Sequence, residues 1–365
     1  METLAYSLLL AHLATLSPAD QLQNICLSPY SLQSAFALVQ EGAKGNTKKE
    51  IEKTLHTKNY VALPDAEVMN EEDVIFDQAN SIWINAVNAP KIKSSFLKTN
   101  AKKYQAEVTT LPFDAAAEQK INDWCSQKTH GRIPHAIDQL NPGNVMELIN
   151  AIYFKGYWVK DFNPRLTQKE DFYVTDDLTV QTSMMHQTTH FLYGEDELCQ
   201  MVELPFRHSY RSKQDEFALQ IILPHEGTTL LGLEQSLAKG YQLPELGVEK
   251  VRLALPKFEL NYSADLIPTL NLMGLSLPFS GKANFSGISK APLCISTVAQ
   301  KTFFKVDETG AEAAAVTEVA MMLTSAMPRP EKIFTMTVDH PFLIRLVNNT
   351  QHTTLFVANI NNPSL

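Results

Sequence analysis

The sequence predicts an α+β fold in which helices pack against large mixed β-sheets. The first third of the chain carries helical spacing and helix-capping residues, whereas strand-forming runs bounded by turn residues predominate from about residue 145. Runs such as residues 218–223 alternate only in part between apolar and polar side chains. This pattern indicates strands that are buried on both faces.

The individual elements follow from these local signals. Apolar residues at helical spacing, or a capping residue at the start, predict helices over residues 4–16, 31–39, 47–55 and 118–125. Strand signals predict strands over residues 148–154, 217–223, 251–255, 293–306, 343–347 and 353–360.

Length and composition bound the domain organisation. The chain has 365 residues, of which 44% are hydrophobic, so it is long enough to bury a large core. Length alone would suggest two or three domains, but no Gly/Ser-rich or Pro-rich linker divides the chain, and no internal repeat or low-complexity tract appears. We therefore expect one domain over residues 1–365.

The charge argues against a general nucleic-acid or polyanion binder. The formal net charge is -9, whereas such a binder needs an excess of Lys and Arg. One basic run is present, at Lys91, Lys93, Lys98, Lys102 and Lys103. Helical spacing would spread it over a solvated face, so no nucleic-acid partner is expected.

Neither a membrane span nor a secretory signal is predicted. No segment reaches the roughly 20 apolar residues that cross a bilayer, and the first basic residue is Lys44. The four cysteines, Cys26, Cys125, Cys199 and Cys294, show no CxxC or zinc spacing. Free, mostly buried thiols suit a cytoplasmic protein, or one secreted without a signal in this chain.

The common catalytic signatures are absent from the sequence. We find no G-x-S-x-G, no H-E-x-x-H, no P-loop and no G-x-G-x-x-G. His186 and His190 have a spacing that binds metal on a helix, but the threonines between them and Phe191 after them favour a strand or loop. The chain is therefore predicted not to be an enzyme, with no cofactor and no metal.

The most informative segment follows Glu308. Every second residue is small or apolar, in the row Ala311, Ala313, Ala315, Thr317, Val319 and Met321. The intervening set carries Glu312 and Glu318, so a strand made from this segment would bury one face and solvate the other. The same residue types favour helix, and no hairpin turn marks the segment. It is typical of an exposed loop that can later become a strand.

A family resemblance adds to this interpretation. Residues 308–315, Glu-Thr-Gly-Ala-Glu-Ala-Ala-Ala, resemble the hinge of the serpin reactive-centre loop, and Asp339-His-Pro-Phe342 resembles the segment that follows it. Further matches occur in the family's order along nearly the whole chain, at residues 24–31, 121–133, 148–158, 202–205, 255–258, 285–288 and 356–363.

The resemblance implies the serpin fold, with mixed β-sheets, about eight to nine helices and an exposed reactive-centre loop over about residues 308–338. It also implies a suicide-substrate mechanism, in which a serine protease acylates on the loop and the cut loop inserts as a central strand of the main sheet. The alternative is a non-inhibitory serpin that acts as a carrier, chaperone or storage protein. We expect a monomer.

The resemblance also assigns site residues. The hinge comprises Glu308, Gly310, Ala311, Glu312, Ala313, Ala314 and Ala315. In the intact protein we expect Ala311 to be solvated. The shutter, beneath the strands that must part, comprises Ser28, Ser31, Asn150 and Gln300, although these residues can equally serve only to satisfy buried backbone groups. Trp158 resembles the tryptophan of the breach, where the loop would enter, or is simply core.

Counting along from the hinge places the reactive bond at Thr324–Ser325. The loop is longer than is typical of the family, so the bonds after Leu323 and after Met322 are alternatives. Thr, Leu or Met before the bond suits an elastase-like or chymotrypsin-like serine protease as the partner.

Overall fold

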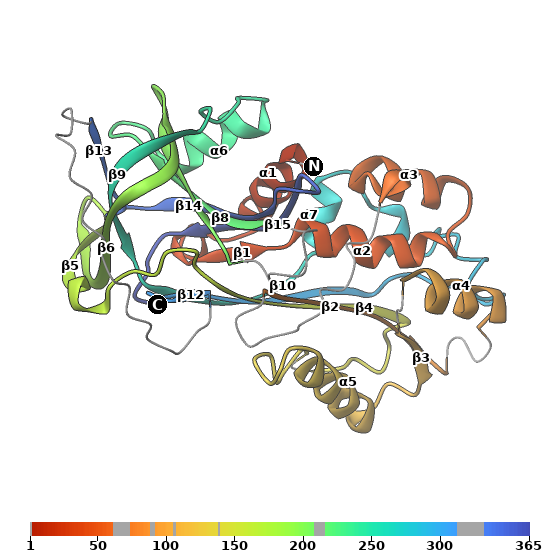
Figure 1. The fold of residues 1–365 in the computed structure, drawn as a ribbon. Helices are drawn as coiled ribbons and strands as arrows, with labels where there is room; N and C mark the ends of the chain where they lie inside the picture. The colour runs from red at the N-terminus through yellow and green to blue at the C-terminus, as the bar shows by residue number, and fades with distance from the viewer. Residues whose placement is uncertain are drawn as a thin grey trace.

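Two β-sheets form the centre of the molecule, with helices around them (Figure 1). The computed structural model describes residues 2–60, 74–87, 92–104, 107–137, 139–207, 216–311 and 332–365. This part of the chain forms seven α-helices: α1 (Glu2–Leu13), α2 (Pro29–Gln40), α3 (Gly45–Leu55), α4 (Ser94–Tyr104), α5 (Ala115–Lys128), α6 (Leu230–Ala238) and α7 (Ile267–Leu272). It also forms four short 3-10 helices: η1 (Asp20–Leu22), η2 (Thr57–Asn59), η3 (Pro164–Leu166) and η4 (Leu277–Phe279). The helix number is close to the eight to nine expected.

The strands divide between a six-stranded sheet, here called the main sheet, and a nine-stranded second sheet. The main sheet has the order β10-β11-β4-β2-β3, with β12 paired to β4, and its strands are β2 (Ile75–Asn85), β3 (Glu107–Leu111), β4 (Met146–Tyr157), β10 (Phe258–Asp265), β11 (Thr297–Val306) and β12 (Gly310–Ala311). The second sheet has the order β1-β15-β14-β8-β7-β6-β9-β13, with β5 paired to β6, and its strands are β1 (Ile25–Leu27), β5 (Gln168–Thr175), β6 (Leu178–Glu195), β7 (Cys199–Pro205), β8 (Phe217–Pro224), β9 (Gly247–Pro256), β13 (Ile333–Thr337), β14 (Phe342–Asn348) and β15 (Thr353–Ile360). The predicted mixed-sheet α+β fold is confirmed.

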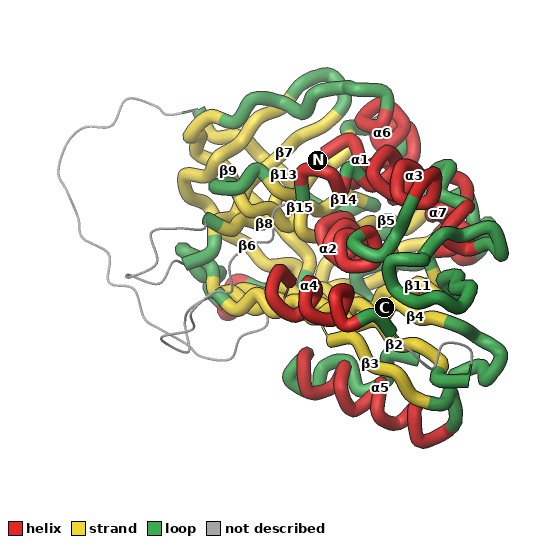
Figure 2. The backbone as a smooth tube through the Cα atoms, turned by 90° about the vertical axis from the view of Figure 1, so that its right-hand side faces the viewer, coloured by secondary structure: helices red, strands yellow, loops and turns green. Residues whose placement is uncertain are grey.

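Helices cover both faces of the main sheet, with α2 above it and α5 below it in Figure 1, an arrangement that Figure 2 shows from the side. Successive residues of β4 alternate between these faces. Leu148 packs in the same core as Phe36 of α2, whereas Ile149 packs with Trp124 of α5. In the second sheet, every residue of β8 is buried, as the partly alternating run at residues 218–223 predicted.

Two predicted elements extended beyond the observed ones, whereas others, such as the helix over residues 118–125, were too short. The helix expected over residues 4–16 ends at Leu13. The next turn is closed by hydrogen bonds between residues three apart, such as that from the Thr15 N–H to the His12 carbonyl, and not four apart as in an α-helix. The strand expected over 293–306 begins at Thr297, because the Ser296 N–H already donates to the Met146 carbonyl outside the regular ladder.

The basic run that the sequence predicts on a solvated face is exposed within the described residues. Lys93, Lys98, Lys102 and Lys103 are exposed on or beside α4, whereas Lys91 lies outside the described part.

Burial raises the pKa of Cys26 and of Cys125 to about 12, so both thiols stay protonated. No helix described here is long and apolar enough to cross a membrane.

Glu234 makes the stability of the fold depend on pH. It is 1% exposed on α6, and this burial raises its pKa to about 7, which a contact with the Asn359 side chain offsets only in part. The unfolded pKa of Glu is about 4.3, so the unfolded chain releases this proton at lower pH than the folded one. Its contribution therefore destabilises the fold progressively as pH rises from about 4.5 to about 7, and is constant above that.

We expect Glu234→Gln to stabilise the intact protein at pH 8 by up to about 3 kcal/mol, and by only about 1 kcal/mol at pH 5. Urea unfolding at both pH values measures this, and the exposed Glu226→Gln serves as the control. The same pH slope in parent and Glu234→Gln would contradict the assignment.

Candidate functional site

The hinge begins inside the main sheet. Gly310 and Ala311 form β12, which pairs antiparallel with the end of β4, Gly310 opposite Tyr157 and Ala311 opposite Gly156. A Cβ on Gly310 would lie 2.0 Å from the Gly156 carbonyl oxygen, and one on Gly156 would lie 2.7 Å from the Phe206 ring. Only glycine permits this close approach at both positions.

The expectation of an exposed loop over residues 308–338 was wrong at both of its ends. Ala311 is 0% exposed, so the expectation that it is solvated in the intact protein was wrong. At the other end Ile333–Thr337 form β13, which pairs parallel with β9 and buries Met336. The remaining predicted residues lie outside the described part: Glu312, Ala313, Ala314, Ala315, Met322, Leu323, Thr324 and Ser325.

Trp158 holds the turn that leads into β12. Its backbone N–H donates to the Thr309 carbonyl (2.9 Å), and its indole Nε1 donates to the Asp307 carbonyl (2.9 Å). The indole also stacks on Phe206, with ring centroids 4.5 Å apart and an angle of 19° between the planes. Trp158 is thus buried, and its hydrogen bonds hold the residues that lead into β12.

Glu308 anchors the same turn through its side chain. Its carboxylate accepts hydrogen bonds from Lys257 Nζ (2.7 Å) and Thr167 Oγ1 (2.8 Å), and its carbonyl accepts one from the Phe162 N–H (2.8 Å). Burial raises the pKa of Glu308, but the bonds from Lys257 and Thr167 outweigh it and bring the pKa below its ordinary value. Charge-assisted hydrogen bonds therefore hold the hinge at Glu308.

Three of the predicted shutter residues meet where α2 begins. The Gln300 amide bonds Ser28 twice, its Oε1 accepting from the Ser28 N–H (2.8 Å) and its Nε2 donating to the Ser28 carbonyl (3.0 Å). The Ser28 hydroxyl donates to the Leu355 carbonyl and caps α2 by accepting from the Ser31 N–H (3.2 Å). These bonds tie β11, α2 and β15 together.

Asn150, the fourth, lies opposite Gln300 in the parallel pairing of β4 with β11. Its side chain turns to the neighbouring strand and donates to Asn80 Oδ1 (2.6 Å), and Asn80 in turn donates to Ser34 Oγ of α2 (2.8 Å). Asn150 Oδ1 is buried and accepts no hydrogen bond within the described residues. A polar row thus crosses β2, β4 and β11 beneath α2.

The comparisons with known proteins agree with this architecture. A family model described as Serpin (serine protease inhibitor) matches residues 5–363. The chain belongs to the serpin family. Serpin B6 of Macaca fascicularis is 32% identical to this serpin over 370 residues, which cover 94% of each chain.

Two solved structures extend the likeness to the fold. Serpin48, described as a highly specific serpin in the insect Tenebrio molitor, matches this serpin with a TM-score of 0.82 at 28% identity, over 99% of this chain and 96% of that one. Human thyroxine-binding globulin in complex with thyroxine matches with a TM-score of 0.80 at 26% identity, over 99% and 97%. The fold alone therefore does not select between inhibition and ligand carriage.

In this serpin, β4 and β11 are neighbours in the main sheet. The two strands pair in parallel from Thr297 opposite Glu147 to Phe303 opposite Tyr153. Their ladder ends there, and β12 pairs with β4 three residues further on. A strand that continued from β12 would have to part this ladder and the shutter contacts beside it.

The sequence predicts hinge, shutter and breach positions, but it did not indicate four residues that contact them in the structure. These are Lys257, Thr167, Asn80 and Ser34. Lys257 lies within the matched residues 255–258, and its charge was an available signal, whereas the other three carry none.

Proposed function

We propose that this serpin inhibits a serine protease as a suicide substrate, by inserting its acylated loop between β4 and β11. The observation that carries the proposal is the register of β12. Each step along the loop from Ala311 moves one residue back along β4, so Ala313 would lie opposite Phe154 and Val319 opposite Leu148. Residues directly opposite in a pair of strands point to the same face.

That face is the α2 side of the main sheet. Phe154 packs in one core with Tyr30 of α2, and Leu148 packs with Phe36 of α2. The row of small and apolar loop residues would therefore enter the core, where a charge would be costly. Glu312 would instead lie opposite Lys155, whose charge complements it.

Insertion would supply a large driving force. About a dozen new backbone hydrogen bonds at about 1 kcal/mol each, with about 1–2 kcal/mol for each buried inward side chain, leave very roughly 15 kcal/mol after losses. This rivals the whole stability of a domain, about 5–15 kcal/mol. The intact protein would therefore be metastable and held by a kinetic barrier.

The same movement would disable the protease. Residues 312–324 span about 40 Å as a strand, so insertion would drag the acylated serine away from the position of its oxyanion hole. One oxyanion donor alone is worth about 3–4 kcal/mol of transition-state stabilisation. Deacylation would then stall and leave the covalent complex.

The test is incubation with pancreatic elastase and with chymotrypsin, followed by a denaturing gel. We expect a band at the summed mass with at least one of them, and none with a protease whose active-site serine has been blocked. Mass analysis of the released C-terminal peptide would show cleavage after Thr324, or after Leu323 or Met322. Cleavage without a complex by both enzymes and by trypsin would contradict inhibition and favour a carrier, chaperone or storage function.

A further inference from the structure

We propose that a cavity between α1, α3 and the turn after α7 binds a small amphipathic carboxylate, a single anionic head on an apolar chain. The cavity has a volume of about 660 Å³, within the range of about 300–1,000 Å³ for ligand sites. It shares none of the residues of the hinge, shutter or breach, so this proposal is independent of protease trapping.

The cationic wall of the cavity comes from α3. Lys49 and Lys53 line it one helical turn apart, and both are exposed. Neither forms an ion pair with a carboxylate of the described residues, whereas the neighbouring Lys48 lies 3.8 Å from Glu52. In a chain of net charge -9, two adjacent lysines that lack an acidic partner favour an anionic ligand.

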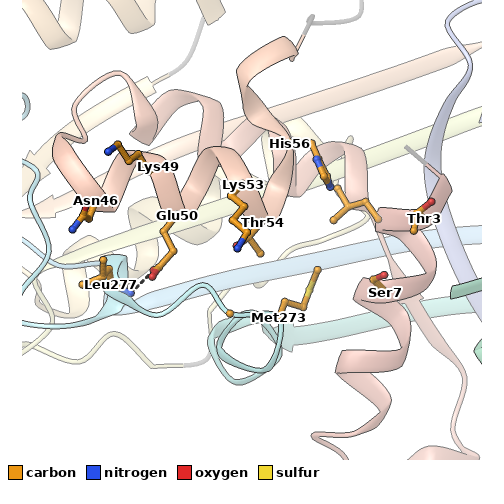
Figure 3. Close-up of a pocket in the computed structure, with 12 residues that line it drawn as sticks. Thr3, Ser7, Asn46, Lys49, Glu50, Lys53, Thr54, His56, Met273 and Leu277 are labelled. Atoms are coloured by element: carbon orange, nitrogen blue, oxygen red, sulfur yellow. Dashed lines mark hydrogen bonds between the residues drawn. The ribbon is translucent and has the colours of Figure 1, made fainter. Parts of the chain in front are cut away.

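The carboxylate that lines the cavity does not neutralise them. Glu50 Oε2 accepts hydrogen bonds from the backbone N–H groups of Ser276 (2.9 Å) and Leu277 (2.7 Å). Figure 3 shows the second of these bonds and shows Glu50, Lys53 and Thr54 projecting from α3 toward Met273 and Leu277. Glu50 thus binds the backbone at the start of η4 and forms no ion pair with Lys49 or Lys53, so the two lysine ammonium groups are available to an anionic ligand.

The opposite wall carries apolar side chains beside the polar Thr3 and Ser7. Leu4 of α1 is 4% exposed, and Met273 and Leu277 are half-buried; all three line the cavity. An inorganic dianion would leave this wall in contact with water, and a neutral chain would leave the lysines without a partner. An alkyl carboxylate suits this lining, because its head can bond a lysine ammonium group while its chain covers the apolar side chains.

Isothermal titration of the full chain with decanoate, decan-1-ol and inorganic phosphate tests the ligand class. We expect decanoate to bind at least about tenfold more tightly than either decanol or phosphate, since a charged hydrogen bond is worth about one decade in affinity or more. Binding of phosphate or decanol as tight as that of decanoate, or no binding of decanoate, would overturn the proposal.

Two variants test the location. Lys49→Gln with Lys53→Gln should weaken decanoate binding by about tenfold or more and leave decanol unchanged. Lys48→Gln, on the same helix but outside the cavity, is the matched control and should change neither. Thr3→Trp places a large side chain at an exposed position of the lining and should abolish the binding of decanoate, with the circular dichroism spectrum reporting an intact fold. Unchanged decanoate affinity in the lysine double variant or in Thr3→Trp would refute the site.

Discussion

Cleavage of the reactive loop should raise the melting temperature of this serpin by about 20 °C. The gain follows from the roughly 15 kcal/mol that insertion would release, divided by an unfolding entropy of about 2 cal/mol/K for each of the 365 residues. The seven-residue ladder between β4 and β11 would be replaced by two ladders on a central strand. The cleaved form would thus be the more stable fold of the same residues.

Differential scanning calorimetry of the intact protein and of protein nicked in the loop measures this shift. Nicking with a non-target protease in catalytic amount avoids the covalent complex. The two forms should also differ in urea, with the cleaved form unfolding at the higher concentration. Equal melting temperatures would show that the cut loop stays outside the sheet, and would remove the basis for inhibition.

Ala311→Arg should convert this serpin from an inhibitor into a substrate. Ala311 is the first residue of the row that would enter the core, and it is already fully buried opposite Gly156. A buried charge without a partner costs about 3–5 kcal/mol, which slows insertion by about 10²–10⁴-fold when the arginine lies outside the sheet in the intact protein. Water would then release the protease before the loop has moved.

The burial of Ala311 adds a second expected effect of this substitution. The arginine must either enter the sheet or force β12 off β4, so the intact protein should lose stability as well. Ala311→Ser is the matched control, because serine is small and uncharged, and it should keep most of the trapping activity. Gel quantification of complex against cleaved product separates the outcomes. An Arg variant that traps protease with the parent's stoichiometry and rate would show that the loop does not insert in this register.

The helices that were predicted from the sequence are those with strong local signals. Ser28 and Asp114 cap α2 and α5 through their side chains, and α3 buries an apolar row on one side. The helices α4, α6 and α7 were not predicted. On α4 only Phe96 and Asn100 are buried, so the helix has no apolar stripe. The strand β6 is 18 residues long because it pairs with β5, β7 and β9 along its length. Pairing with distant strands cannot be predicted from the residues of β6 alone.

The site was predictable where it depends on a local pattern and unpredictable where it depends on register. The alternation that begins at Ala311 marks the segment as a potential strand by itself. That Gly310 and Ala311 are already paired depends on glycine at position 156, more than 150 residues earlier in the chain. The contacts of Asn150 with Asn80 and of Glu308 with Lys257 likewise join residues 70 and 51 positions apart.

If the loop inserted in this register, the buried Asn150 oxygen would gain the hydrogen-bond donor that it lacks among the described residues of the intact protein. A buried acceptor without a donor costs about 1–3 kcal/mol, and the intact fold carries that cost beneath α2. Continued pairing from β12 would bring Thr317 opposite Asn150, with Gln300 on its other side, and so deliver a hydroxyl donor to this oxygen. In the part of the intact protein that the structure describes, this oxygen lacks one donor, and we propose that Thr317, in the segment expected to insert, would supply it.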